Sequence, residues 1–417
     1  MAQLSDDCFA FGGALLGIDA VRKMIFERVT PVAGVEPVPL RRALGRTLAQ
    51  DIAAPIDVPG YDNSAVDGYA VRFDDLDPAH ETVLRCVDRA AAGHGATMAL
   101  GPGEAIRIFT GAMLPDGADV VIMQEDCLRE ADQVTIRPGI KRGANLRRAG
   151  EDVARNSRAL GAGRRLGPAD LGLLAALGFV EVPVRRRLSV ALLSTGDEVR
   201  EPGKALRQGQ VHDANRYMLA GMLERLDVDV SDLGIVRDDA ASLGDVLREA
   251  AAASDLIVTS GGVSTGEEDH VRSAIANHGS LYFWRLAIKP GRPVAMGQIG
   301  ATPLAGLPGN PVAALLTFAL VARPMIEALS GTDPHIARRF RVRSAFDYRK
   351  KAGRREFVRV SLDRPAAGLA TATRFPKEGA GMLTSLTETD GLVELPEELT
   401  RLASGTEVDF VPYSELV

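Results

Sequence analysis

Strand-like and helix-like segments alternate between residues 187 and 330, and this alternation limits the possible folds more than any other feature of the chain. The predicted strands are 188–193, 228–236, 254–258, 281–288, 292–296 and 302–307. Amphipathic spacing predicts helices at 215–226 and 240–253. Alternation at this spacing predicts a doubly wound α/β domain with a parallel sheet.

Polar turns follow five of the predicted strands. They are Asp197 with Glu198, Asp238 with Asp239, residues 260–269, Lys289, and residues 308–311. Ligands of open α/β sheets bind outside the carboxyl ends of the strands. We therefore expect these turns to converge at one edge of the sheet and to form a binding site there.

The turn after the strand 254–258 is rich in glycine and hydroxyl side chains. The residues expected to form an anion cradle are Ser260, Gly261, Gly262, Ser264 and Gly266. Asp269 and the two glutamates before it add carboxylates, which favours a divalent cation bridging carboxylate and phosphate. The alternative is a glycine-rich connection that leads into a helix with an acidic N-terminus.

Composition narrows the class of protein. Hydrophobic residues make up 46% and charged residues 25% of 417 residues, as in soluble globular proteins, and the net charge of −6 indicates no nucleic-acid partner. Cys8, Cys86 and Cys127 form no CxxC pair, which favours a reducing compartment. The apolar stretch 311–322 is too short to span a membrane. We expect a cytoplasmic protein that contacts no membrane.

The rest of the chain predicts further domains. β-rich segments between 82 and 136 indicate a small inserted β domain, and strand-like segments between 341 and 411 indicate a small β-barrel or sandwich. Helices are expected at 17–29 and 166–177, and 37–40 is expected to be a linker. The predicted domains are 1–45 with 145–185, 46–144, 186–330 and 335–417.

Several catalytic motifs are absent from the sequence: the P-loop, HExxH, CxxC and the G-x-S-x-G elbow. The remaining combination is an anion-binding edge with carboxylates and one lysine, Lys289. It suits Mg²⁺-assisted chemistry at a phosphate or pyrophosphate. From spacing alone, Asp197, Glu198 and Asp239 are either metal ligands or salt-bridged turn residues.

Six motifs occur in a fixed order along the chain. They begin at Asp62 (DNSAVDGYA), Thr110 (TGA), Ser194 (STGDE), Ser260 (SGGVSTGEED), Ile288 (IKPGRP) and Gly306 (GLPGNP). Together they resemble the molybdopterin molybdenumtransferases, the molybdenum-inserting enzymes of molybdenum-cofactor biosynthesis, to which gephyrin is related. The resemblance extends from about residue 18 to the C-terminus.

The resemblance implies a homodimer of L-shaped form, with an elongated linking domain, an inserted β domain, an α/β domain of the molybdopterin-binding type and a C-terminal β-barrel in each subunit. It implies an enzyme that inserts molybdenum from molybdate into adenylylated molybdopterin, with Mg²⁺-dependent release of AMP. The implied partners are a molybdopterin adenylyltransferase and downstream molybdenum-cofactor proteins. Two alternatives are a molybdopterin adenylyltransferase and a non-catalytic scaffold of the same fold.

The resemblance also assigns site residues. Asp67 and Thr110 would face the cleft of the partner subunit, and Glu198, Asp238 and Asp269 would be carboxylates of that cleft that bind the metal. The remaining implied cleft residues are Lys289, Pro308, Gly309, Asn310 and Pro311. Either Ser385 or Thr384 would be contributed by the last domain. Arg285 and Arg292 stand where lysine is expected, which keeps the charge but changes its geometry.

Overall fold

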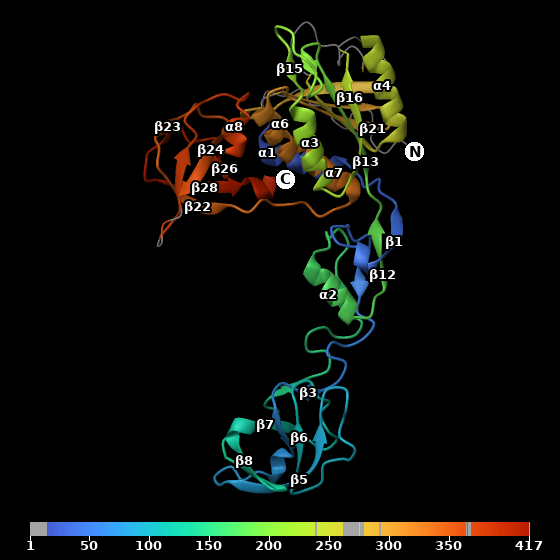
Figure 1. The fold of residues 1–417 in the computed structure, drawn as a ribbon, viewed down its shortest axis with the longest axis vertical. Helices are drawn as coiled ribbons and strands as arrows, with labels where there is room; N and C mark the ends of the chain where they lie inside the picture. The colour runs from blue at the N-terminus through green and yellow to red at the C-terminus, as the bar shows by residue number, and fades with distance from the viewer. Residues whose placement is uncertain are drawn as a thin grey trace.

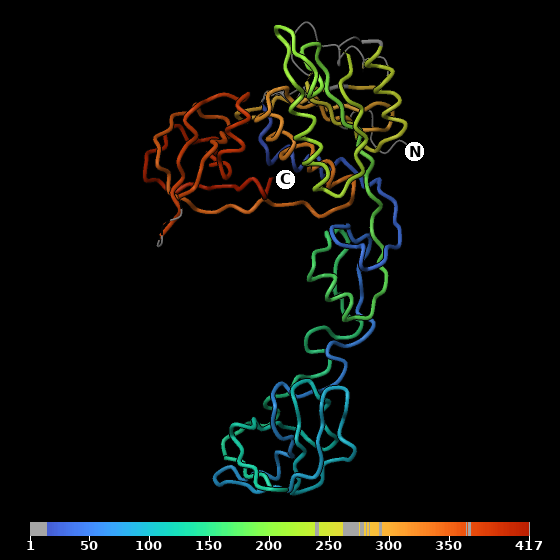
Figure 2. Tube along the Cα trace, in the orientation of Figure 1, coloured from blue at the N-terminus to red at the C-terminus, as the bar shows by residue number. Residues whose placement is uncertain are grey.

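The computed structural model describes residues 15–237, 240–261, 275, 279–291, 293–363, 365 and 368–416. The molecule is elongated, with the inserted β domain at one end and the α/β domain beside the C-terminal barrel at the other (Figure 1). A narrow linking domain connects the two ends, and the chain runs through it twice (Figure 2).

The α/β domain is built on one mixed sheet. Its strands are, in spatial order, β16 (Asp229–Val236), β13 (Ser189–Thr195), β17 (Leu256–Ser260), β21 (Thr302–Leu307), β20 (Pro293–Ile299) and β18 (Gly279–Arg285). The first four are parallel, but β20 is antiparallel to both of its neighbours. The expectation of a wholly parallel sheet is wrong because Gly300 and Ala301 alone join β20 to β21, and so short a connection links only antiparallel strands.

Both faces of this sheet are buried. Alternate residues of β13 point to opposite sides, with Val190 and Leu192 in one apolar cluster and Ala191 and Leu193 in another. α3 (Asn215–Glu224) packs on the first face, and α4 (Ala240–Ala253) packs on the second. Helices on both faces define the doubly wound arrangement.

One helical rod of the core runs from Pro311 to Ser330. It comprises α6 (Pro311–Thr317), a π-helical turn (Phe318–Ala322) and α7 (Arg323–Ser330). The rod is longer than the expected apolar stretch, and it is long and apolar enough to cross a membrane. However, 83% of its most apolar part is buried inside the protein. It is therefore explained as a core helix.

The linking domain is held by two short strand pairs. β1 (Val35–Pro39) pairs with β12 (Glu181–Arg185), and β2 (Ile52–Ala53) pairs with β11 (Arg158–Leu160). Residues 37–40 were expected to be a linker, but most of them lie in β1, since backbone pairing with β12 overrides their proline content. The helix α2 (Pro168–Ala176) covers this small core.

The helix α1 (Ile18–Arg28) packs against α7 in the α/β domain, although its position in the sequence predicted that it belongs to the linking domain. Its buried residues Ile18, Val21 and Ile25 join the main core of the α/β domain. The apolar face of α1 is therefore buried by elements more than 200 positions away in the sequence.

The inserted domain is a six-stranded sheet. Its strands are, in spatial order, β7 (Val120–Met123), β4 (Gly68–Val71), β6 (Glu104–Ile108), β5 (Thr82–Ala90), β9 (Gln133–Ile136) and β8 (Cys127–Glu130). β8 was not predicted; three of its four residues are exposed, so it carries little apolar signal. Two shorter strands, β3 (Asn63–Ser64) and β10 (Leu146–Arg147), pair where the chain enters and leaves the domain.

The C-terminal domain is a closed barrel. Its strands are β24 (Arg355–Asp363), β25 (Thr371–Arg374), β22 (Phe340–Ser344), β28 (Glu407–Pro412) and β26 (Gly391–Leu395), and a pairing of β24 with β26 closes the ring. β19 (Ile288–Lys289) leaves the α/β domain and pairs with β24. The fold class predicted from the sequence is thus confirmed in its α/β domain, inserted β domain, linking domain and barrel.

Candidate active-site cleft

A cavity of about 300 Å³ lies at the carboxyl ends of β13 and β17. The side chains and turns that matter here are Glu198, Asn215, Ser260, Gly261, Gly309 and Pro311. Five of these six were predicted as site residues, and the structure brings them together from three separate turns. The sixth, Asn215, was predicted only as the start of a helix.

Asn215 holds two of these turns in place. Its Nδ2 donates to Ser260 Oγ at 2.8 Å and to the carbonyl oxygen of Gly309 at 2.9 Å. Asn215 is buried, so these bonds are shielded from water. Its role depends on residues far away in the sequence, which is why the helical pattern alone did not reveal it.

The cleft contains polar atoms without a protein partner. Ser194 Oγ, Thr195 Oγ1 and Asn215 Oδ1 are buried and make no hydrogen bond within the described part of the chain. All three residues line the cavity. Buried polar groups in native proteins are nearly always satisfied, so this cluster indicates that a ligand or ordered water completes the site.

Gly261 brings the backbone close to β13. Its φ is +86°, and a Cβ atom placed on it would lie 2.5 Å from the carbonyl oxygen of Thr195. Only glycine fits this turn without a shift of the backbone.

We expect Gly261→Ala to lower the thermal unfolding midpoint of the protein clearly more than Gly203→Ala. Gly203 has a similar φ of +84°, but a Cβ atom placed on it would meet nothing within 4 Å, so it reports the cost of the backbone conformation alone. That conformational cost is about 1–2 kcal/mol, and the clash at Gly261 adds about 1–3 kcal/mol. Equal unfolding midpoints for the two variants would contradict the close approach of Gly261 to β13.

The metal ligands expected from the resemblance are only partly described. Glu198 lines the cavity and is exposed, and its carboxylate lies over Gly196, where a Cβ atom would be 2.7 Å from Glu198 Oε2. Asp238 and Asp269 lie outside the described residues, as do Gly262, Ser264, Gly266 and Arg292. Among the residues that the structure covers, no three acidic, histidine or cysteine side chains form a metal-binding group.

Lys289 follows the carboxyl end of β18, which runs parallel to β21, but it does not line the first cavity. It belongs to β19 and lines a second cavity, of about 250 Å³, against the barrel. Its Nζ is 3.3 Å from the buried carboxylate of Glu356, which also accepts from Tyr348 at 2.9 Å. Burial lowers the pKa of Lys289, but Tyr348 and Glu356 outweigh this and raise it, so the ammonium stays charged.

Two arginines of the barrel share this second cavity with Lys289 and were missed in the sequence. Arg359 donates to the carbonyl oxygen of Gly379 at 3.0 Å, and its buried Nε has no partner in the described chain. Arg374 lies over the ring of Tyr348, 5.1 Å from its centroid, and pairs with Glu378. The sequence holds no local signal for these two arginines, because only the folded chain brings the cationic side chains together in a cavity between two domains.

The two cavities adjoin through one segment of the C-terminal domain. Gly379 and Ala380 line the second cavity, Gly381 lines the first, and Ala380 accepts a hydrogen bond from Val312 N at 3.0 Å. α8 (Thr384–Thr387) follows directly. Ser385 is fully buried and its hydroxyl bonds to the carbonyl oxygen of Met382, whereas Thr384 is exposed.

The remaining predicted residues of the α/β domain that the structure describes line neither of these cavities. Asn310 is the N-cap of α6, but its side chain makes no capping hydrogen bond. Pro308 precedes it in the same turn. Arg285 is exposed at the end of β18, and its carbonyl oxygen accepts from Leu16 N at 2.9 Å.

Asp67 and Thr110 form a pair on the inserted domain. The backbone N–H and the hydroxyl of Thr110 both donate to Asp67 Oδ1 at 2.8 Å, and these bonds lower the pKa of Asp67. The carboxylate is therefore ionised at neutral pH. Within one subunit the inserted domain lies at the opposite end of the molecule from the cleft (Figure 1).

Comparison with known proteins gives a consistent result. Residues 16–178 match the MoeA N-terminal region (domain I and II), residues 191–328 match a probable molybdopterin binding domain, and residues 341–413 match the MoeA C-terminal region (domain IV). The molybdopterin molybdenumtransferase of Haemophilus influenzae is 36% identical over 97% of this chain and 100% of its own length. Molybdopterin molybdenumtransferase 2 of Mycobacterium tuberculosis is 37% identical over 89% of this chain and 93% of its own.

A solved structure agrees. The molybdopterin biosynthesis moeA protein of Pyrococcus horikoshii has a TM-score of 0.81 and 29% identity, covering 96% of this chain and 100% of that one. Fold and cleft thus define a multidomain protein with an α/β domain of the molybdopterin-binding type. The chain belongs to the molybdopterin molybdenumtransferase family, the enzymes of molybdenum-cofactor biosynthesis that the sequence motifs indicated.

Proposed function

We propose that the chain inserts molybdenum from molybdate into adenylylated molybdopterin and releases AMP in a Mg²⁺-dependent step. The observation that carries this proposal is the cleft at the ends of β13 and β17, whose unpartnered polar groups adjoin a cationic cavity through the segment 379–381. The cleft suits the pyrophosphate of the substrate, and the adjoining cationic cavity suits molybdate.

The cleft would hold the pyrophosphate of the substrate. Ser260 and the turn at Gly309 provide hydroxyl and amide groups at a strand edge, where anions bind in α/β sheets. Lys289, Arg359 and Arg374 would hold molybdate, because guanidinium and ammonium groups favour tetrahedral oxyanions. Attack by water or a molybdate oxygen at phosphorus would break the phosphoanhydride bond and release AMP.

The donor set of the cleft fits Mg²⁺. Glu198 presents a carboxylate, and Asn215 Oδ1 and the hydroxyls of Ser194 and Thr195 are oxygen atoms without partners in the described residues. We propose that Glu198 holds the ion together with Asp238 and Asp269. Bound Mg²⁺ would neutralise charge on the pyrophosphate.

We also propose that the working unit is a homodimer. Asp67 and Thr110 belong to the inserted domain, which lies at the opposite end of their own subunit from the α/β domain, so they would reach a cleft in another copy of the chain. Two hydrogen bonds from Thr110 hold the ionised carboxylate of Asp67 in a fixed orientation, which suits a residue that completes the cleft of another subunit.

The decisive experiment incubates the purified protein with adenylylated molybdopterin, Mg²⁺ and molybdate and measures AMP release and pterin-bound molybdenum. Molybdate-dependent AMP release is the expected result. Binding of the pterin without AMP release would favour the scaffold alternative. Adenylylation of free molybdopterin by ATP would favour the adenylyltransferase alternative, which the cationic cavity against the barrel disfavours because that activity needs no molybdate.

Lys289→Gln should raise the KM for molybdate about tenfold or more, since one charge-assisted contact to the oxyanion is lost. The KM for adenylylated molybdopterin should change little. Lys351→Gln is the matched control, because Lys351 is an exposed lysine of the same region outside the cavity. An unchanged KM for molybdate in Lys289→Gln would remove the cavity from the proposed site.

A further inference from the structure

The first turn of α3 carries a buried arginine next to Asn215. The side chain of Arg216 is 5% exposed, and it pairs with the carboxylates of Glu201, Asp213 and Asp232. Its Nε lies 3.0 Å from Asp213 Oδ2, whereas its two Nη atoms contact Glu201 and Asp232. Burial lowers the pKa of Arg216, but these carboxylates outweigh burial and raise it, so the guanidinium stays charged. One buried cation therefore holds separate segments of the α/β domain together.

Two of these carboxylates belong to a loop that borders the cleft. We call residues 196–213 the cleft loop. The residues of this loop that line the cavity are Glu198, Val199, Val211, His212 and Asp213. Within the loop, β14 (Val199–Arg200) and β15 (Val211–His212) form a short parallel pair. Glu201 follows β14 directly and Asp213 follows β15 directly, so the guanidinium holds this pair where both strands end.

The third carboxylate connects the cleft loop to the central sheet. Asp232 lies on β16, which pairs with β13 from one end to the other. The helix that carries Arg216 is fixed as well, because Leu219 and Leu223 are buried in the main core. The cleft loop is thus attached through one side chain to a strand and a helix that are both held by the core.

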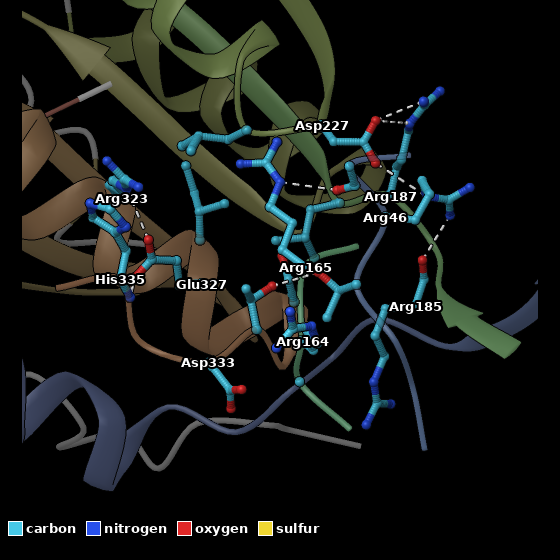
Figure 3. A pocket seen from close by; sticks show the side chains of 18 of the residues that line it. Arg46, Arg164, Arg165, Arg185, Arg187, Asp227, Arg323, Glu327, Asp333 and His335 are labelled. Carbon is cyan, nitrogen blue, oxygen red and sulfur yellow. Dashed lines mark hydrogen bonds and ion pairs between the residues drawn. The ribbon is translucent and has the colours of Figure 1, made fainter. Parts of the chain in front are cut away.

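A second buried arginine provides a comparison outside the cleft. A cavity of about 330 Å³ lies between the linking domain and the α/β domain, and Arg46 lines it (Figure 3). Arg46 pairs with Glu36 and, at 3.2 Å, with Asp227. Among the described residues, no side chain lines both this cavity and the cleft. Arg46 therefore makes the same kind of ion pair as Arg216, but at a domain boundary.

We propose that Arg216 is a positioning residue of the active site, which holds the cleft loop so that the carboxylate of Glu198 is presented to the metal. This inference rests on the proposed function, because that function assigns Glu198 to the metal. Loss of a group that orients a metal ligand changes metal affinity or activity by about 10–100-fold. Lysine at this position would keep the charge, but it lacks the planar fork that reaches several carboxylates at once.

The test compares four variants of the full-length protein. The release variants are Arg216→Lys, which removes the guanidinium, and Glu201→Ala, which removes an anchor of the loop. The control variants are Asp232→Ala and Arg46→Lys. Asp232→Ala is matched to Glu201→Ala, since the two side chains are 46% and 41% exposed and contact the same guanidinium. Arg46→Lys is matched to Arg216→Lys, since both arginines are buried and paired with carboxylates.

The first measurement is hydrogen–deuterium exchange of the protein without metal or substrate. The N–H of Val211 donates to the carbonyl oxygen of Glu198, and the N–H of Asp213 donates to that of Arg200, both at 2.9 Å. Exchange of such amides reports local opening of the loop. We expect the release variants to exchange them about tenfold faster or more, because breaking a buried ion pair is strongly destabilising. The control variants should exchange them at the wild-type rate.

The second measurement is the Mg²⁺ concentration that gives half-maximal AMP release. It should rise about tenfold or more in Arg216→Lys, and in the same direction in Glu201→Ala. The KM for molybdate should change little in either variant, because the proposed molybdate site at Lys289 is a separate cavity. The control variants should keep the wild-type Mg²⁺ requirement.

Several results would overturn the proposal. They are unchanged exchange of the cleft loop in the release variants, equal effects in release and control variants, and faster exchange with an unchanged Mg²⁺ requirement. If Glu198→Gln also leaves that requirement unchanged, the assignment of Glu198 in the proposed function has failed, and the proposal fails with it. The exchange data still show in that case whether Arg216 holds the loop. If Arg216→Lys does not fold, the comparison of Glu201→Ala with Asp232→Ala decides.

Discussion

Glu198→Gln should reduce molybdate-dependent AMP release by about 10²-fold or more, while the protein still binds adenylylated molybdopterin. Glutamine keeps the size of the side chain but removes the negative charge that we assign to the metal in the cleft. Loss of one preorganised electrostatic partner of a transition state costs about 10²–10³-fold in rate. The Mg²⁺ concentration needed for half-maximal activity should rise in parallel.

Asp197→Asn is the matched control for this variant. Asp197 is the neighbouring exposed carboxylate, but it does not line the cavity. Its activity should stay close to that of the wild-type protein. Equal losses in both variants would mean that the turn after β13 acts through its overall charge, and an active Glu198→Gln variant would exclude Glu198 as a metal ligand.

Mixing inactive Asp67→Asn subunits with inactive Glu198→Gln subunits should restore about a quarter of wild-type activity. If Asp67 of one subunit completes the cleft of the other, a mixed dimer has one cleft with both residues intact and one with neither. Random exchange makes about half of the dimers mixed, and one of their two sites works, which gives about a quarter.

Activity that stays at the level of the separate variants would contradict the shared site. If Asp67 and Glu198 acted within one subunit, every subunit of the mixture would carry one defect and nothing would be restored. Mixing Asp67→Asn with Thr110→Ala is the control, because these residues form one hydrogen-bonded pair and no mixed dimer would regain an intact site.

Local patterns predicted most of the α/β domain. The helix 240–253 coincides with α4 because its apolar spacing matches a helix packed on one side only. The same patterns could not show that β20 runs against its neighbours, since strand direction depends on the connection and not on apolar content. The edge strand β8 was missed because most of its residues are exposed.

Local patterns likewise predicted one part of the candidate site and not the other. The turns with Glu198, Ser260 and Gly309 were predicted to converge because each follows a parallel strand, and parallel strands end at one edge. The separate cavity of Lys289 was not predicted, and Arg359 was missed, because this cavity is lined by residues of two domains. Pairing of β19 with β24 creates that cavity, and no local feature of Lys289 indicates such a partner.

The slender connection to the inserted domain allows that domain to change its orientation relative to the rest of the subunit. Below the linking domain two lengths of chain continue, joined by backbone contacts such as those of Val58 with Val153 and Ala54 with Ser157 (Figure 1). A slight twist at this neck would move the inserted domain, which carries Asp67, through a wide arc. In the proposed homodimer, the stiffness of this connection would therefore determine how accurately the inserted domain is positioned at the cleft of the other subunit.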